Sequence, residues 1–163
     1  MNRLVALSAA ALVSSAMLVA LPCNALAQGA QQDIDEGRAM VRAGFRNLIR
    51  EEISMTEQES AAFWPVYDEY ERAVTAIMDR YSRLVSDYVD RFDRGDLSND
   101  YANELLSEYF AIRQELLDVR RAFIPEFKAV LPSLKVARLY QLENKVNAEV
   151  DIQLALAIPL ISE

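Results

Sequence analysis

Residues 56–94 read TEQESAAFWPVYDEYERAVTAIMDRYSRLVSDYVDRFDR, and this stretch decides the fold class. Its large apolar side chains follow one another at spacings of four and three, the 3.5-residue repeat of a helix with one buried seam. The seam comprises Phe63, Tyr67, Tyr70, Val74, Ile77, Tyr81, Leu84 and Tyr88. Thr56 and Glu59 have the spacing of a capping box, and Gly95 is a natural helix terminator. The pattern therefore predicts one long helix between them.

The same period returns after a short turn at residues 93–97. Ser98 can cap the new helix, and its seam comprises Ala102, Leu105, Tyr109, Ile112, Leu116, Val119 and Phe123. Two long helices with facing seams and a short connection predict an antiparallel hairpin. Proline inside a helix removes a backbone donor, so we expect Pro65 and Pro125 to kink these two helices.

Two more helices are predicted, one on each side of the hairpin in the sequence. The first covers about residues 33–53, and the last covers about 133–157 with Ser133 as its cap. The last helix carries apolar residues around most of its circumference, and one hairpin can cover only one side of it. The expected fold is therefore all-α, an elongated four-helix hairpin with long kinked helices, assembled as an antiparallel homodimer.

The first 27 residues have the three parts of a cleavable export signal. Arg3 is followed by an apolar run over residues 4–21, and the triplet Ala25-Leu26-Ala27 offers a cleavage site. A membrane anchor is the alternative, but helix-breaking Pro22 directly follows the run. We expect residues 28–163 to form a single exported domain without stable membrane insertion.

Composition limits the chemistry that this domain can perform. The net charge is −8, and removal of Arg3 with the signal makes it −9, which argues against nucleic-acid binding. The chain has no histidine, and its one cysteine, Cys23, lies in the signal. The carboxylates Glu51, Glu52, Glu57 and Glu59 could hold only a hard ion such as calcium, and solvated acids at helix ends are the favoured interpretation. We therefore predict no catalytic activity, no metal and no cofactor.

Four arginines in the first predicted helix form the leading candidate site. Arg38, Arg42, Arg46 and Arg50 follow one another at a spacing of four, which places them in a stripe along one side. Such a stripe could attract acidic, partly unfolded proteins or an acidic partner, along the concave face of the expected dimer. In so acidic a chain we favour the alternative, in which these arginines pair with carboxylates such as Asp68, Glu69 or Glu71.

Aromatic residues form the second candidate site. The tyrosines at positions 67, 70, 81, 88, 109 and 140 could offer an adaptable surface, but at helical spacing they are more often core. Phe63, Trp64, Pro65 and Tyr67 mark the start of the long helix. We expect Trp64 to pack that start against the last helix.

Two short motifs resemble those of a known family. Met55-Thr56-Glu57-Gln58-Glu59 resembles the LTxxQ motif, and a weaker copy recurs at residues 97–101, beginning Leu97-Ser98. The chain is similar to the exported Spy/CpxP-like, LTxxQ-motif group of bacterial envelope proteins, and to a subgroup with FWPVY (residues 63–67) and LYQLENK (residues 139–145). Three positions depart from the motif: Glu59 replaces Gln, Ser98 replaces Thr and Tyr101 replaces Gln.

The resemblance implies a periplasmic, all-helical protein, often an antiparallel dimer shaped like a shallow cradle. Relatives in this group act as ATP-independent chaperones or as inhibitory partners of envelope stress sensors, and a third branch senses metals. The sequence therefore predicts a chaperone-like stress protein that binds unfolded or partner proteins. A regulatory partner of a membrane sensor is the alternative, and a metal-sensing module is the third.

Overall fold

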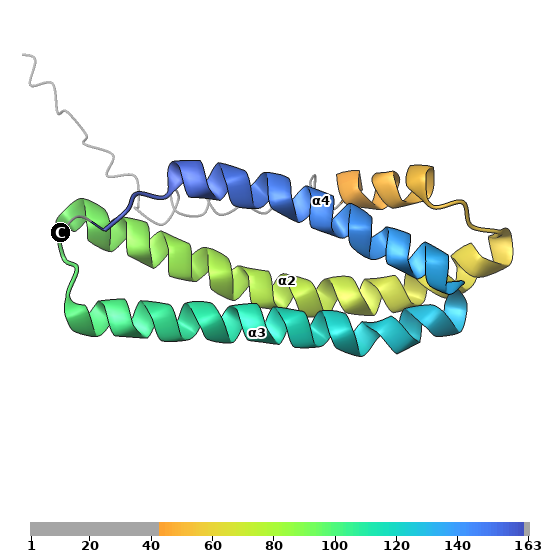
Figure 1. Ribbon diagram of the computed structural model, residues 1–163, viewed down its shortest axis with the longest axis horizontal. Coiled ribbons are helices and arrows are strands. Elements are labelled where there is room, and N and C mark those ends of the chain that lie inside the picture. The colour runs from red at the N-terminus through yellow and green to blue at the C-terminus, as the bar shows by residue number, and fades with distance from the viewer. Residues whose placement is uncertain (1–42, 162–163) are drawn as a thin grey trace, which may run out of the picture. The chain divides into compact units, whose positions relative to one another are not determined.

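The computed structural model describes residues 43–161 of the chain (Figure 1). In this part the chain is helical and contains no strand. A helical segment at residues 43–52 is followed by α2 (Glu57–Arg94), α3 (Asn99–Val130) and α4 (Ser133–Ala157). Residues 45–161 belong to one compact unit. The all-α prediction is confirmed, and the predicted start of the first helix at residues 33–42 lies outside the described residues.

The hairpin forms because its ends are capped and its seam is apolar. At the start of α2, the Thr56 hydroxyl accepts from the Glu59 amide at 3.2 Å, and the Thr56 amide donates to Glu59 Oε2 at 2.8 Å. Gly95 ends the helix with a φ of 66°, a conformation that glycine adopts without steric cost. Ser98 then caps α3 by accepting from the Tyr101 amide at 3.1 Å. All three sequence predictions are confirmed, and α2 and α3 pack side by side (Figure 1).

The two interior prolines leave their helices continuous. Pro65 lies within α2 and Pro125 within α3, and each helix extends well beyond its proline. Both prolines are exposed. The missing backbone donor therefore costs each helix a hydrogen bond without ending it.

The predicted cap of α4 is wrong. Ser133 is the first helical residue, and Pro132 occupies the capping position without a side-chain hydrogen bond. The fixed φ of Pro132, −56°, holds an extended conformation in which its carbonyl accepts from the amides of Lys135 (2.9 Å) and Val136 (3.2 Å). The backbone of Pro132 thus does what the Ser133 hydroxyl was expected to do.

Buried side chains form two clusters of different composition. The proximal cluster, where α3 meets α4, draws on the helical segment 43–52 and on α2, α3 and α4. It comprises Ile49, Ile53, Phe63, Tyr67, Tyr70, Phe127, Leu131, Val136, Leu139 and Leu142. The distal cluster, toward the turn between α2 and α3, comprises only Ile77, Ile112 and Leu116 of the hairpin. The second half of α4 therefore contributes no side chain to either buried cluster.

One polar network joins the three long helices beside the proximal cluster. The Tyr70 hydroxyl of α2 donates to Glu143 Oε1 of α4 at 2.6 Å, and Arg120 of α3 pairs with the same carboxylate oxygen at 3.4 Å. The Tyr140 hydroxyl donates to the Arg120 carbonyl at 2.6 Å. Burial raises the pKa of the Tyr70 phenol, because the buried site disfavours its charged form.

Candidate functional site

Within the described part of the arginine stripe, Arg46 makes structural contacts with α2. Arg46 Nη2 lies 2.5 Å from Asp68 Oδ1 and 2.7 Å from Glu71 Oε2, and its Nε donates to Glu71 Oε1 at 3.3 Å. Its guanidinium carbon also lies 5.6 Å from the Trp64 ring centre and 5.3 Å from that of Tyr67. The hydrogen bond to Glu71 is the main reason that the pKa of Arg46 is raised. Arg46 is therefore held by two carboxylates of α2, as the favoured interpretation predicted.

Arg50, the other member of the stripe that the structure describes, lies over an aromatic ring. The guanidinium carbon of Arg50 lies 4.5 Å from the Trp64 ring centre, and its Nη1 donates to the Asn47 side chain at 3.0 Å. Arg38 and Arg42 lie outside the described residues. The prediction of an open basic surface is therefore wrong at Arg46, whose guanidinium is paired with Asp68 and Glu71.

The aromatic group at the start of α2 is a packing site. Phe63 and Tyr67 are buried, Trp64 is half-buried and Pro65 is exposed. Trp64 Nε1 donates to Ser60 Oγ at 3.1 Å, and its ring lies under the guanidinium groups of Arg46 and Arg50. The ring thus braces the start of α2 against the segment 43–52, a contact that the expectation of packing on the last helix did not include.

The first LTxxQ-like site acts as a helix start that also holds α4. Lys135 Nζ donates to Glu59 Oε2 at 2.6 Å, and this hydrogen bond is the main cause of the lowered pKa of Glu59. Met55 is half-buried and packs on the proximal cluster. Glu59 therefore provides a charged link between α2 and α4 in addition to its role in the capping box.

The second LTxxQ-like site is a helix start at the distal end. Leu97 is half-buried, and Ser98 is exposed while its hydroxyl caps α3. Tyr101, which stands where the motif has Gln, is buried with the guanidinium carbon of Arg91 4.4 Å from its ring centre. Burial, with Asp87 nearby, raises the pKa of Tyr101 to about 12.

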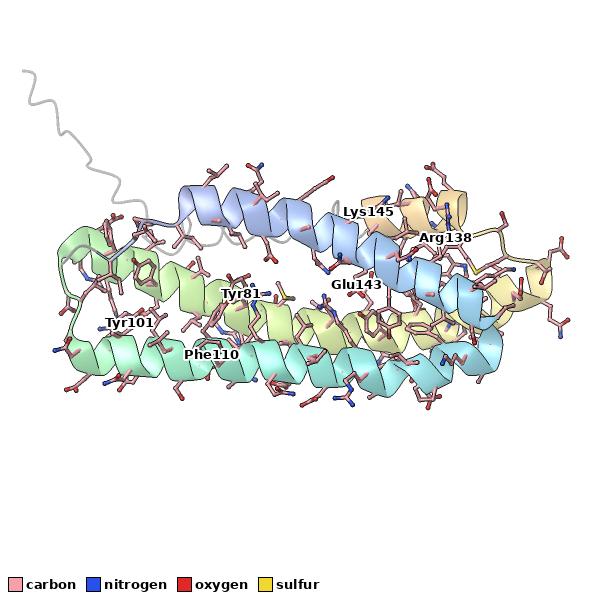
Figure 2. All side chains as sticks on the ribbon, in the orientation of Figure 1. Tyr81, Tyr101, Phe110, Arg138, Glu143 and Lys145 are labelled. Carbon is pink, nitrogen blue, oxygen red and sulfur yellow. The ribbon has the colours of Figure 1, made fainter. Side chains whose placement is uncertain are left out.

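The acidic residues near the first helix junction are mostly engaged or exposed. Glu52 pairs with Arg138 of α4, Glu59 pairs with Lys135, and Glu51 and Glu57 are exposed. Within residues 43–161, no three potential ligands gather to hold a metal ion. A depression of about 450 Å³ is lined by Glu52, Arg138 and Lys145 among others, but the Glu52 carboxylate and the Arg138 guanidinium there already pair with each other. Figure 2 labels Arg138 and Lys145, which both belong to α4.

The most distinctive surface lies at the distal end. Its Tyr81, Tyr88 and Tyr109 belong to the second candidate site, whereas its aliphatic lining was not among the predicted sites. A mostly apolar pocket of about 280 Å³, here called the distal groove, opens between α2, α3 and the chain after α4. It is lined by Tyr81, Leu84, Val85 and Tyr88 of α2, Leu105, Leu106 and Tyr109 of α3, and residues 158–161. Figure 2 labels Tyr81 and Phe110, which lie on opposite helices in this half of the hairpin.

Large apolar side chains continue this surface outside the groove. Leu106 and Phe110 are 56% and 64% exposed, and Leu117 follows two turns later on the same face of α3. Arg113 lies among them, with its guanidinium carbon 5.4 Å from the Tyr81 ring centre and 5.3 Å from that of Tyr109. The signal for this site was in the sequence, because Val85, Leu106, Phe110 and Leu117 are apolar residues that fall outside the two seams.

Comparison with known proteins finds no match. No family model, no curated protein and no solved structure is similar to the chain. The resemblance to the LTxxQ-motif group therefore stays a prediction that depends on the two short motifs. No helix in the described part of the chain is long and apolar enough to cross a membrane.

Proposed function

We propose that the chain is an exported, chaperone-like envelope-stress protein that holds apolar segments of partly unfolded proteins without catalysis. The proposed location is the periplasm, because residues 1–27 have the pattern of an export signal and the motifs resemble a periplasmic group. The proposed binding surface is the distal groove together with Leu106, Phe110 and Leu117 of α3. This replaces the arginine stripe, of whose two described members Arg46 is held by carboxylates and Arg50 lies over the Trp64 ring.

The observation that supports the proposal is the contrast between the two ends of the hairpin. At the proximal end, four helical elements bury their apolar side chains together. At the distal end, the groove stays open and Phe110 stands 64% exposed beside it. Soluble proteins rarely leave contiguous large apolar side chains uncovered unless they bind something. Half-buried Tyr81 and Tyr109 add amphipathic rings, which suit contact with varied sequences.

Charged substitutions on this surface should weaken client protection. We expect the mature protein to slow aggregation of a reduced or heat-stressed client without nucleotide. The Leu106→Glu, Phe110→Glu variant should lose about thirtyfold in effective affinity, because two apolar contacts of about 1 kcal/mol each are removed. Light scattering of the aggregating client gives the measurement. Both residues are exposed, so helix content by circular dichroism should not change.

Leu134→Glu is the matched control for that experiment. Leu134 is 86% exposed at the opposite end of the molecule, so its substitution adds one surface carboxylate, as each substitution of the double variant does, without touching the distal groove. Protection that is lost equally in the control, or no protection across several unrelated clients, would refute the chaperone proposal. A pull-down from envelope extract separates the alternatives: a diffuse set of clients supports the chaperone, and one dominant stoichiometric partner supports a regulator of a membrane sensor.

We also propose that the protein is a homodimer through the outer face of α4. Ile152 and Leu156 are 58% and 78% exposed on one side of this helix, a self-complementary strip that a C2 partner can cover. Multi-angle light scattering should give a dimer at tens of micromolar. The Ile152→Glu, Leu156→Glu variant should dissociate, because four carboxylates would then face one another across the axis. A wild-type monomer at that concentration would contradict the dimer.

A further inference from the structure

The end of the chain already occupies part of the distal groove. α4 stops at Ala157, and Ile158 adopts an extended conformation with φ −82° and ψ 120°. From there the chain crosses toward the end of α2 (Figure 1), and residues 158–161 line the groove together with Tyr88 and Leu106. This short apolar sequence, Ile-Pro-Leu-Ile, is here called the tail.

The tail is bound through its backbone. The Tyr88 hydroxyl of α2 donates to the Pro159 carbonyl oxygen at 2.7 Å. A backbone carbonyl is present in every peptide, so this hydrogen bond selects an extended chain without selecting its sequence. Tyr88 itself is buried in the hairpin, which fixes the position of its hydroxyl. The groove thus has the two features that a general peptide site needs, an apolar lining and a backbone donor.

The tail fills this site incompletely. Leu160 is 88% exposed and Ile161 is 51% exposed, so both side chains keep much of their apolar surface in water. About 280 Å³ remains open between the tail and the hairpin. The second half of α4 also holds the hairpin weakly, since its ion pair there, Arg113 with Asp151, is 3.5 Å long and partly exposed. A segment that buried its side chains more fully would displace the tail.

We propose that the tail is an internal competitor of the distal groove, whose external ligand is an extended apolar peptide segment of the same kind. This inference depends on the proposed function and names its ligand class and its regulation. The tail covers part of the apolar lining of the groove when no client is present. A client segment with larger apolar side chains takes the place of residues 158–161 and accepts the Tyr88 hydrogen bond.

A peptide-exchange experiment tests the proposal. The probe is a fluorescein-labelled hexapeptide with the sequence of residues 157–162, Ala-Ile-Pro-Leu-Ile-Ser, titrated with protein while fluorescence anisotropy is measured. The full chain with Ile158→Ser and Ile161→Ser should bind the probe at least about tenfold more tightly than the wild-type chain, because its own tail competes less. Adding Leu106→Glu to that variant should remove the binding, and adding Tyr88→Phe should weaken it about fivefold, the effect of one neutral hydrogen bond.

Two further measurements keep the result decisive. A chain ending at Ala157 removes the competitor entirely and should bind the probe as the double serine variant does, and a probe with serine at its Leu and Ile positions should not bind. Equal affinity of the wild-type and opened chains for the probe would overturn the proposal, as would no binding by either opened chain when its circular dichroism is native. The client assay distinguishes the two proposals. Peptide exchange without client protection would support the competitor and refute the chaperone. Client protection that is equal in the wild-type and opened chains would support the chaperone and refute the competitor.

Discussion

Phe127→Ala should lower the free energy of unfolding by about 3–5 kcal/mol, the usual cost of deleting a fully buried aromatic ring. Phe127 of α3 is 0% exposed at the centre of the proximal cluster. Its ring centre lies 5.7 Å from that of Phe63, 5.4 Å from that of Tyr70 and 6.2 Å from that of Tyr140. One truncation therefore leaves a cavity against α2 and α4 at once. Urea unfolding followed by circular dichroism measures the loss.

Phe110→Ala is the matched control, since it is the same change on the same helix. Phe110 is 64% exposed, so its truncation should change the free energy of unfolding by less than about 0.5 kcal/mol. If the two variants were equally destabilised, the division into a packed proximal end and an open distal surface would be contradicted. If Phe127→Ala alone cost less than about 1 kcal/mol, the proximal cluster would not be the main source of stability.

Alkaline pH should lower the free energy of unfolding of the protein. Burial raises the pKa of Tyr67 and Tyr70 above their ordinary value of 10.0. The native state therefore keeps these phenol protons where the unfolded chain has lost them, and stability that is complete below pH 10 falls as the pH rises further. For Tyr70 alone the expected slope is about 1.4 kcal/mol per pH unit above pH 10. Urea unfolding between pH 8 and pH 11.5 measures it.

Tyr70→Phe isolates the contribution of this one phenol. The variant loses the hydrogen bond to Glu143, so it should be less stable by about 1 kcal/mol below pH 10. Above pH 10 its stability should fall less steeply than that of the wild type, and the two curves should converge. Parallel curves over the whole range would show that another group, such as the buried Tyr67 phenol, controls alkaline unfolding.

The helices of the described region could be predicted because their signals are local. The seam from Phe63 to Tyr88 is visible as spacing alone, and its members are buried or half-buried in the structure. Thr56, Gly95 and Ser98 act on backbone groups within three or four residues, so their roles follow from the sequence. The cap of α4 was misassigned to Ser133 for the same reason, since a proline and a serine side by side offer two local ways to cap a helix.

The candidate site was harder to predict because it depends on which partner each side chain meets. Spacing placed Arg46 on a stripe, but only the packing of segment 43–52 against α2 brings Asp68 and Glu71 to its guanidinium. Leu106 and Phe110 can be recognised in the sequence as apolar residues outside the seams, but nothing in the local sequence reveals that α4 leaves them uncovered. Net charge and periodicity can be read from one segment alone, whereas ion pairs and exposure depend on residues far away in the chain.

The sequence by itself determined the all-α class, the hairpin and its caps, because helix period and capping act within a few residues. Which apolar side chains of α4 are buried and which are exposed depends on tertiary contacts. Leu139 of α4 is buried in the proximal cluster, whereas Leu156 of the same helix is 78% exposed. This difference arises because α4 packs closely on the hairpin only in its first half. Similar leucine side chains are therefore buried at one end of the helix and exposed at the other.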